Sequence, residues 1–170
     1  MDPFTTLGVP ARFDLDLAAV EKTHRELSRA LHPDRYVSAG ASERRDALGR
    51  AVAVNEAWRV LRDPIRRAHA LLAARGVTLA EGREPAADPV FLMEMLERRE
   101  ALDEAKQAKN LLAVLEMARD IDARFKVVES ELVAGFAGGE AAALAPKLGE
   151  LRYYRRFLDD VSAIEDELSA

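Results

Sequence analysis

Two amphipathic runs joined by a short loop around Pro33 are the feature that most constrains how this chain folds. In the first run, the residues of the mainly apolar side are spaced three or four apart: Leu17, Val20, His24, Leu27 and Leu31. This spacing is typical of one face of an α-helix. Proline lacks a backbone N–H and disfavours a helical residue before it, so Pro33 stops the helix.

The second run begins near Ser42, a candidate N-cap, and continues to about Arg62. Its apolar residues also have helical spacing: Ala47, Ala51, Val54, Trp58 and Leu61. Two helices joined by a short loop pack their apolar faces together in antiparallel orientation. We therefore expect a helical hairpin whose polar tip, His32-Pro33-Asp34, is held in a position suited to recognition.

Shorter elements flank this hairpin. Residues 4–7 are predicted to form a helical turn, and Asp16 is expected to cap the first long helix. Asp63 as N-cap and Pro64 as first helical residue predict a fourth helix, which ends at Gly76.

The segment 76–87 contains Gly82 and Pro85 and has little periodicity, which is typical of a linker. The sequence therefore predicts an N-terminal domain over 1–75 and a C-terminal domain over 88–170. In the C-terminal domain we expect a three-helix bundle. Its helices cover residues 88–105, 108–136 and 140–168, and Pro146 either marks the true start of the third helix or kinks it. The predicted fold class is all-α.

Composition narrows the function classes. The 170 residues are 49% hydrophobic with few glycines and prolines, as in a helical globular protein. A net charge of −5 argues against non-specific nucleic-acid binding. The chain has no cysteine, which fits a reducing cytoplasm. No apolar run approaches the roughly 20 residues that span a bilayer, and no secretory signal or arginine-rich transit segment is found.

Motifs that indicate an enzyme or a metal centre are missing. There is no cysteine nucleophile, no glycine-rich phosphate loop and no Ser-His-Asp set on a plausible scaffold. Of the three histidines, His24 lies on the core side of its helix, and His69 indicates no site. His24 and His32 are about two turns apart, too far for a helical metal pair. We expect a non-enzymatic chain without metal or cofactor.

A basic stripe lies on the solvent side of the first long helix and extends past the loop. Its members are Lys22, Arg25, Arg29 and Arg35. Two interpretations are open. The stripe is either a solvated face balanced by Glu21 and Glu26, or a surface that recognises an acidic partner.

The predicted helix 88–105 has a wider apolar arc than one buried face requires. Phe91, Met95 and Leu102 suit a single face. Further apolar residues widen the arc: Leu92, Met93 and Leu96. These side chains either pack on the N-terminal domain or a neighbouring helix, or form an exposed patch rimmed by Glu97 and Glu100.

The helix, His-Pro-Asp tip and second helix resemble a J-domain. Asn55-Glu56-Ala57-Trp58 and Leu61 late in the second helix support this, and residues 1–8 resemble the opening helix of that fold. Leu31 stands where tyrosine is usual and Arg35 where lysine is common, so apolar packing and charge are preserved.

The resemblance implies that the tip and the basic stripe bind a heat-shock chaperone of the DnaK/HscA type. In this interpretation Asp34 is the ion-pairing group, His32 a hydrogen-bonding and packing group, and Pro33 fixes the turn. The implied chaperone-binding set is His32, Pro33, Asp34, Lys22, Arg25, Arg29 and Arg35.

Residues 91–97 and 102–104 resemble the C-terminal bundle of HscB-type co-chaperones, which serve iron–sulfur cluster assembly. That resemblance implies that helix 88–105, with an aromatic residue of the last helix, binds the iron–sulfur scaffold protein. Tyr153 is the implied aromatic residue, with Tyr154 and Phe157 as alternatives. The implied scaffold-binding set is Leu92, Met93, Leu96, Glu97, Glu100 and Tyr153.

The sequence thus predicts a two-domain co-chaperone. It would stimulate the ATPase of a DnaK-type chaperone, of the specialised HscA type, and deliver the scaffold protein to it for cluster transfer. Two alternatives stay open. The chain is a J-domain co-chaperone with a different client, or a helical adaptor whose J-domain is vestigial.

Overall fold

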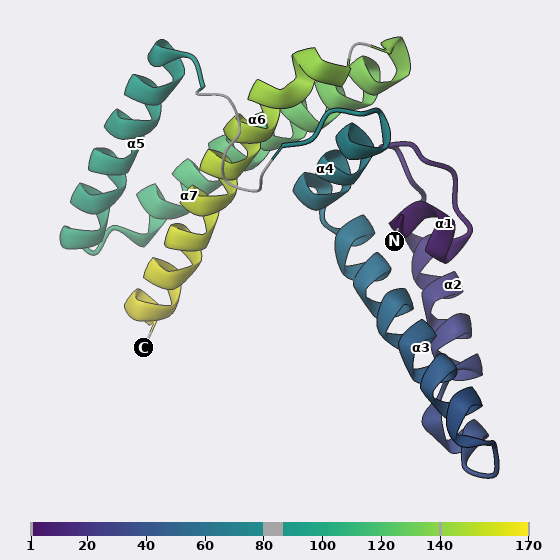
Figure 1. Ribbon diagram of the computed structural model, residues 1–170. Helices are drawn as coiled ribbons and strands as arrows, with labels where there is room; N and C mark the ends of the chain where they lie inside the picture. Colours follow the sequence, from purple (N-terminus) through teal and green to yellow (C-terminus); the bar gives the residue numbers. More distant parts are fainter. Residues whose placement is uncertain (1, 80–86, 140, 170) are drawn as a thin grey trace. The chain divides into compact units, whose positions relative to one another are not determined.

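Figure 1 shows the computed structural model, which describes residues 2–79, 87–139 and 141–169. The residues in these ranges form helices, turns and loops without any strand, so the predicted all-α fold class is confirmed. The chain divides into two compact units, Met1–Thr78 (the hairpin unit) and Leu79–Ala170 (the bundle unit). Most of the predicted linker lies outside the described residues. No helix within those ranges is long and apolar enough to cross a membrane.

The hairpin unit is built on α2 (Leu17–Ala30) and α3 (Ala41–Arg62), which pack side by side. The 3-10 turn η1 (Pro33–Tyr36) lies between them and holds the predicted tip, while α1 (Pro3–Leu7) packs against α3. Buried apolar side chains form the core: Phe4, Leu7, Phe13, Val20, Leu31, Ala47, Val54, Ala57, Leu61, Ile65, Ala68, Leu71 and Leu72. This packing fixes the tip at the end of a rigid hairpin.

The two acidic N-caps that the sequence predicts for this unit are confirmed. Asp16 accepts a hydrogen bond from the backbone N–H of Ala19 at the start of α2 (3.1 Å). Asp63 accepts two backbone N–H bonds, at 2.9 and 3.0 Å, at the start of α4 (Pro64–Ala74). Each cap satisfies N–H groups that have no partner inside the helix.

The predicted N-cap of α3 is wrong. The helix begins at Ala41, so Ser42 lies inside its first turn. Gly40 occupies the cap position with an extended backbone (φ −62°, ψ 159°) and no side-chain hydrogen bond. Glycine is among the residues tolerated at this position, which explains why a hydroxyl is not required there.

The bundle unit consists of α5 (Pro89–Gln107), α6 (Leu111–Gly138), the short turn η2 (Ala141–Leu144) and α7 (Ala145–Ser169). Helices α6 and α7 have the largest interface, and α5 packs on both. Successive helices run in opposite directions, so α5 and α7 are parallel. The apolar core includes Met95, Leu102, Val114, Ile121, Phe125, Val128, Leu132, Phe136, Leu148, Leu151, Tyr154, Phe157, Val161 and Ile164.

Two predicted boundaries in the bundle unit are corrected. The second helix starts at Leu111 rather than near Ala108, because Lys109 has a left-handed backbone (φ 51°) and Asn110 caps α6. The third begins at Ala145 rather than at Glu140, a residue outside the described ranges. Pro146 therefore marks the start of α7, where proline is tolerated because first-turn N–H groups have no helical partner.

Candidate functional site

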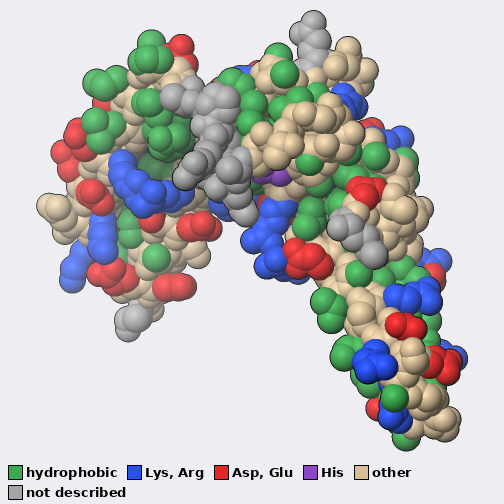
Figure 2. Space-filling view, viewed as in Figure 1, with side chains coloured by type: hydrophobic (Ala, Val, Ile, Leu, Met, Phe, Trp, Pro, Cys, Tyr) green, Lys and Arg blue, Asp and Glu red, His purple; other side chains and the backbone are tan. Residues whose placement is uncertain are grey.

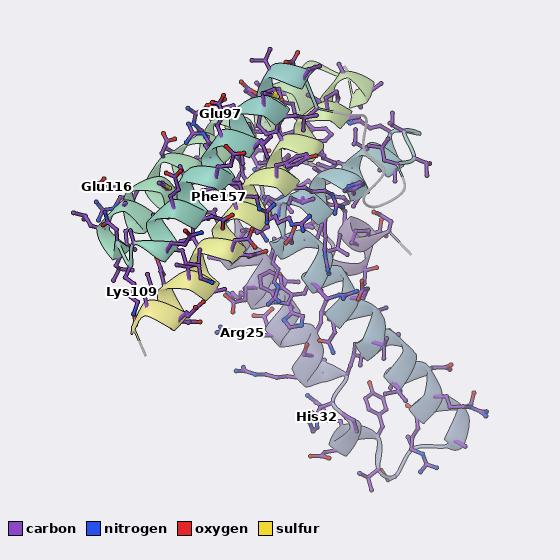
Figure 3. All side chains as sticks on the ribbon, turned by 90° about the vertical axis from the view of Figure 1, so that its left-hand side faces the viewer. Arg25, His32, Glu97, Lys109, Glu116 and Phe157 are labelled. Atoms are coloured by element: carbon purple, nitrogen blue, oxygen red, sulfur yellow. The ribbon has the colours of Figure 1, made fainter. Side chains whose placement is uncertain are left out.

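The tip of the hairpin unit presents His32 and Asp34 to solvent, and Figure 3 shows the position of His32. His32 caps η1: its Nδ1 accepts a hydrogen bond from the backbone N–H of Asp34 (3.4 Å). The carboxylate of Asp34 lies 3.4 Å from the same nitrogen, and its side chain is 86% exposed. Pro33 is the first residue of η1, where its fixed φ suits the turn. The tip thus holds an accessible carboxylate on a rigid backbone.

The four members of the basic stripe differ in their surroundings. Arg25 pairs with Glu21 one turn earlier on α2, at 2.5 Å. Lys22, Arg29 and Arg35 are exposed and make no ion pair with any of the described residues. The interpretation of a balanced, solvated face therefore fits Arg25, whereas the other three cations keep their charge available for a partner.

His24 does not belong to this polar surface. Its Nε2 lies 2.9 Å from Oδ1 of Asn55, and its ring stacks on Trp58 with centroids 5.5 Å apart. The imidazole therefore links α2 to α3, as expected of a packed and hydrogen-bonded histidine. Among the residues that the structure describes, no group of three or more His, Cys, Asp or Glu is arranged to hold a metal ion.

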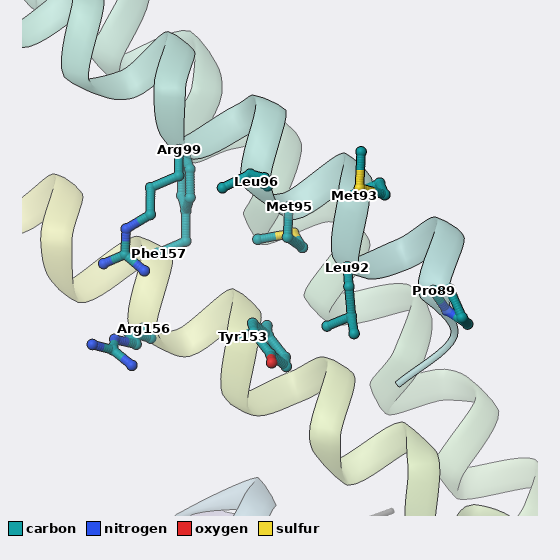
Figure 4. A pocket seen from close by; sticks show the side chains of 9 residues that line it. All are labelled: Pro89, Leu92, Met93, Met95, Leu96, Arg99, Tyr153, Arg156 and Phe157. Carbon is teal, nitrogen blue, oxygen red and sulfur yellow. The ribbon is translucent and has the colours of Figure 1, made fainter. Parts of the chain in front are cut away.

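A groove of about 550 Å³ lies between α5 and α7 of the bundle unit (Figure 4). Met95 and Phe157 are buried at its base, and Leu92 is half-buried. Met93, Leu96 and Tyr153 remain exposed, with 52% of Leu96 open to solvent. Figure 2 shows hydrophobic side chains at the surface of the bundle unit over α5. The wide apolar arc of α5 is therefore only partly used by the core.

The three candidate aromatic residues have different positions. Tyr153 lines the groove and is 44% exposed, whereas Tyr154 and Phe157 are buried. The ring of Phe91 meets Tyr153 and Tyr154 edge to face, with centroids 5.7 and 5.5 Å apart. Tyr153 is thus the aromatic side chain that a partner can reach most fully, and its orientation is supported from α5.

The two glutamates predicted to rim the apolar patch lie beside the groove, and two arginines line it. Glu97 and Glu100 are exposed on α5 but do not line the groove. Arg99 and Arg156 line it instead, and sequence reasoning missed both. The spacing in the sequence could have indicated both residues. Arg99 follows Leu96 by three residues and Arg156 follows Tyr153 by three, so each pair lies on one helical face.

A charged network holds α5 against α6 beside the groove. Arg98 contacts Asp120 (2.6 Å) and Glu94 (3.1 Å), and Arg124 contacts Glu94 (3.1 Å) and Asp120 (3.1 Å). Partial burial disfavours the charge on Asp120, but hydrogen bonds and charge from Arg98 and Arg124 outweigh it and lower the pKa of Asp120. Burial raises the pKa of Tyr154, although a hydrogen bond with Arg124 opposes that shift.

Comparison with known proteins identifies the family. A model of the HscB C-terminal oligomerisation domain matches residues 87–162. The co-chaperone protein HscB homologue of Bordetella petrii is 37% identical over 162 residues, which cover 95% of each chain. The chain belongs to the HscB co-chaperone family. The family predicted from the sequence is thereby confirmed, and with it the function of a J-type co-chaperone in iron–sulfur cluster assembly.

Solved structures of the HscB family have the same fold. Chaperone HscB from Vibrio cholerae matches with a TM-score of 0.89 and 30% identity, covering 99% of both chains. Human co-chaperone HscB matches with a TM-score of 0.89 over 97% of this chain and 82% of its own, at 23% identity. The match to the human protein shows the shared fold alone.

Proposed function

We propose that the chain stimulates ATP hydrolysis by a heat-shock chaperone of the DnaK/HscA type and delivers the iron–sulfur scaffold protein to it. The observation that carries this proposal is the presence, in one chain, of an accessible carboxylate at a rigid tip and an open apolar groove. The chain itself catalyses no reaction, because hydrolysis belongs to the chaperone. Both partners and the chain meet in the cytoplasm.

At the tip, Asp34 forms an ion pair with a cation of the chaperone. His32 and Pro33 hold its backbone, because one caps the η1 turn and the other fixes its first dihedral angle. Binding accelerates hydrolysis only if the tip prefers the hydrolytic conformation of the chaperone, since equal affinity for two states shifts nothing. Lys22, Arg29 and Arg35 steer the approach to an acidic surface, and Arg25 contributes less because Glu21 partly neutralises it.

At the groove, apolar side chains of the scaffold protein contact Leu92, Met93, Leu96 and Tyr153. These residues surround a concave base, and concave apolar centres with polar rims are typical of protein interfaces. Glu97 and Glu100 lie outside the lining and act as charged rim contacts on the α5 side. Most of the binding energy is expected from the few anchors that become fully covered.

The test uses purified chaperones of the HscA and DnaK types from the same organism. Adding the chain should increase the steady-state ATPase rate of both, with half-maximal stimulation at a lower concentration for the HscA type. If neither chaperone is stimulated, the proposal is contradicted, and an adaptor with a vestigial J-domain is favoured.

Calorimetric titration with the scaffold protein tests the second half of the proposal. We expect saturable binding by the full chain. Stimulation of the chaperone without any scaffold binding would show that the chain is a J-domain co-chaperone for a different client.

A further inference from the structure

Arg156 is the one charged side chain of the groove lining that has no partner within the described ranges. It lies on α7, is exposed, and makes no ion pair or side-chain hydrogen bond with any described residue. The remaining lining is apolar except for Arg99 and the hydroxyl of Tyr153. Figure 4 shows Arg99 and Arg156 at the same end of the groove, away from Pro89 and Met93.

The neighbouring carboxylate does not neutralise Arg156. Asp160 lies one helical turn beyond Arg156 on α7, the spacing at which side chains of a helix meet. Its Oδ2 is already bound by Arg99, which reaches across from α5. Asp159, three residues beyond Arg156, forms no ion pair with a described residue, so the charge of Arg156 stays available to a partner at this end of the groove.

We propose that Arg156 forms a carboxylate-binding subsite at the end of the apolar groove. This inference rests on the proposed docking of the scaffold protein. The bound segment carries an Asp or Glu side chain beside the apolar residue that enters the groove. A guanidinium group binds a carboxylate through two parallel N–H···O bonds, so the contact specifies position as well as charge.

The subsite also gives the groove a direction. Arg99 and Arg156 lie at one end of the lining, whereas the end at Pro89 and Met93 is apolar. A segment with a carboxylate at one end of its apolar part reaches Arg156 in one orientation and places that carboxylate against apolar side chains in the reversed one. Apolar contacts alone do not distinguish the two orientations, because hydrophobic attraction is non-directional.

The experiment measures scaffold binding by calorimetry with Arg156→Glu, Arg156→Gln and Arg156→Lys. Arg119→Glu on α6 is the matched control, since Arg119 is exposed, lies outside the groove lining and makes no ion pair with the described residues. We expect Arg156→Glu to weaken binding about tenfold, as for loss of a charge pair covered in a complex. Arg156→Gln should have a smaller effect, and Arg156→Lys should retain part of the affinity.

A scaffold variant completes the test. Each exposed Asp and Glu of the scaffold protein is replaced by Lys in turn, and one replacement should restore the affinity of Arg156→Glu while weakening wild-type binding. If Arg156→Glu binds like Arg119→Glu while Leu92→Ala with Leu96→Ala abolishes binding, the subsite is overturned and the groove assignment stands. If the leucine variant binds like wild type, the groove assignment itself fails, and the subsite with it.

Discussion

The tip of the hairpin unit and the groove of the bundle unit are proposed to recognise partners by different physical means. The tip is convex and polar, and its main group is one exposed carboxylate, Asp34. The groove is concave and mainly apolar, and its walls come from two parallel helices far apart in sequence. A carboxylate acts through charge and geometry, whereas an apolar groove acts through the area removed from water. Contacts made by the tip are therefore expected to be salt-sensitive and those made by the apolar lining of the groove largely salt-insensitive.

The two sites also differ in how closely function is tied to folding. His32, Pro33 and Asp34 are exposed, so their side chains contribute little to the core of the hairpin unit. In the groove, Met95 and Phe157 serve both the core and the site. Substitutions at the tip should therefore separate activity from stability more cleanly than substitutions in the groove.

The largest effect is expected at the tip. Asp34→Asn keeps the size of the side chain and removes its charge, so stimulation of the chaperone ATPase should fall to the basal rate. Thermal stability should stay nearly unchanged, since exposed substitutions usually alter the unfolding free energy by less than about 0.5 kcal/mol. Asp46→Asn, at an exposed position of α3, is the control in the ATPase assay. Full stimulation by Asp34→Asn would show that the charge of the tip does not act on the chaperone.

The next effect concerns the groove. Leu92→Ala with Leu96→Ala should weaken scaffold binding about a hundredfold if the two losses add, because each truncated anchor costs about tenfold. Stability should fall only slightly, since Leu96 is half exposed and Leu92 is partly so. Leu112→Ala with Val127→Ala removes exposed side chains of α6 and is the matched control. A loss of several kcal/mol in unfolding free energy, as for buried leucines, would assign these residues to the core instead.

A smaller effect separates the members of the basic stripe. The rate of association with the chaperone should fall as salt rises, because the Debye length is about 10 Å at 0.1 M ionic strength. Arg29→Glu should slow association more than Arg25→Glu, since Arg25 is already paired with Glu21. Stopped-flow measurements at several salt concentrations check this order. Equal rates for both variants and wild type would restore the interpretation of a solvated face.

The smallest effect is the pH dependence that Asp120 gives to the stability of the bundle unit. The pKa of Asp120 is lowered in the folded state, so its ionised form stabilises the fold above its unfolded pKa of about 4. That contribution is lost as pH falls through the lower, folded-state value. Asp120→Asn should therefore show a shallower loss of stability below about pH 4 than wild type. Because Asp120 is half exposed, the difference should stay below about 1 kcal/mol.

Denaturant titrations at several pH values measure this difference. Asp159→Asn on α7 is the control, since Asp159 is exposed and forms no ion pair in the described part of the chain. The hypothesis fails if Asp120→Asn and Asp159→Asn have the same pH profile.

The tip was predictable from sequence and the groove only in part. His32, Pro33 and Asp34 are contiguous, and helical spacing on both sides of Pro33 determines the hairpin that holds them. The sequence also indicated that the apolar face of α5 is wider than the core requires, because Leu92 and Leu96 are one turn apart. The position of Arg156 on the same helical face as Tyr153 could be read from their spacing, but its place beside Arg99 could not, since that depends on the packing of α5 and α7 and on Arg99 binding Asp160. Periodicity within one helix contains no information about its register with another.

The central claim is that the tip acts on the chaperone and the groove on the scaffold protein, each through its own surface. The most direct test is single-turnover ATP hydrolysis by the chaperone, measured with wild type, Asp34→Asn and the Leu92→Ala, Leu96→Ala variant, each with and without scaffold protein. The groove variant should retain full stimulation in the absence of scaffold and lose any further stimulation that scaffold adds, while Asp34→Asn should lose both. Loss of scaffold-free stimulation in a well-folded groove variant would contradict the claim.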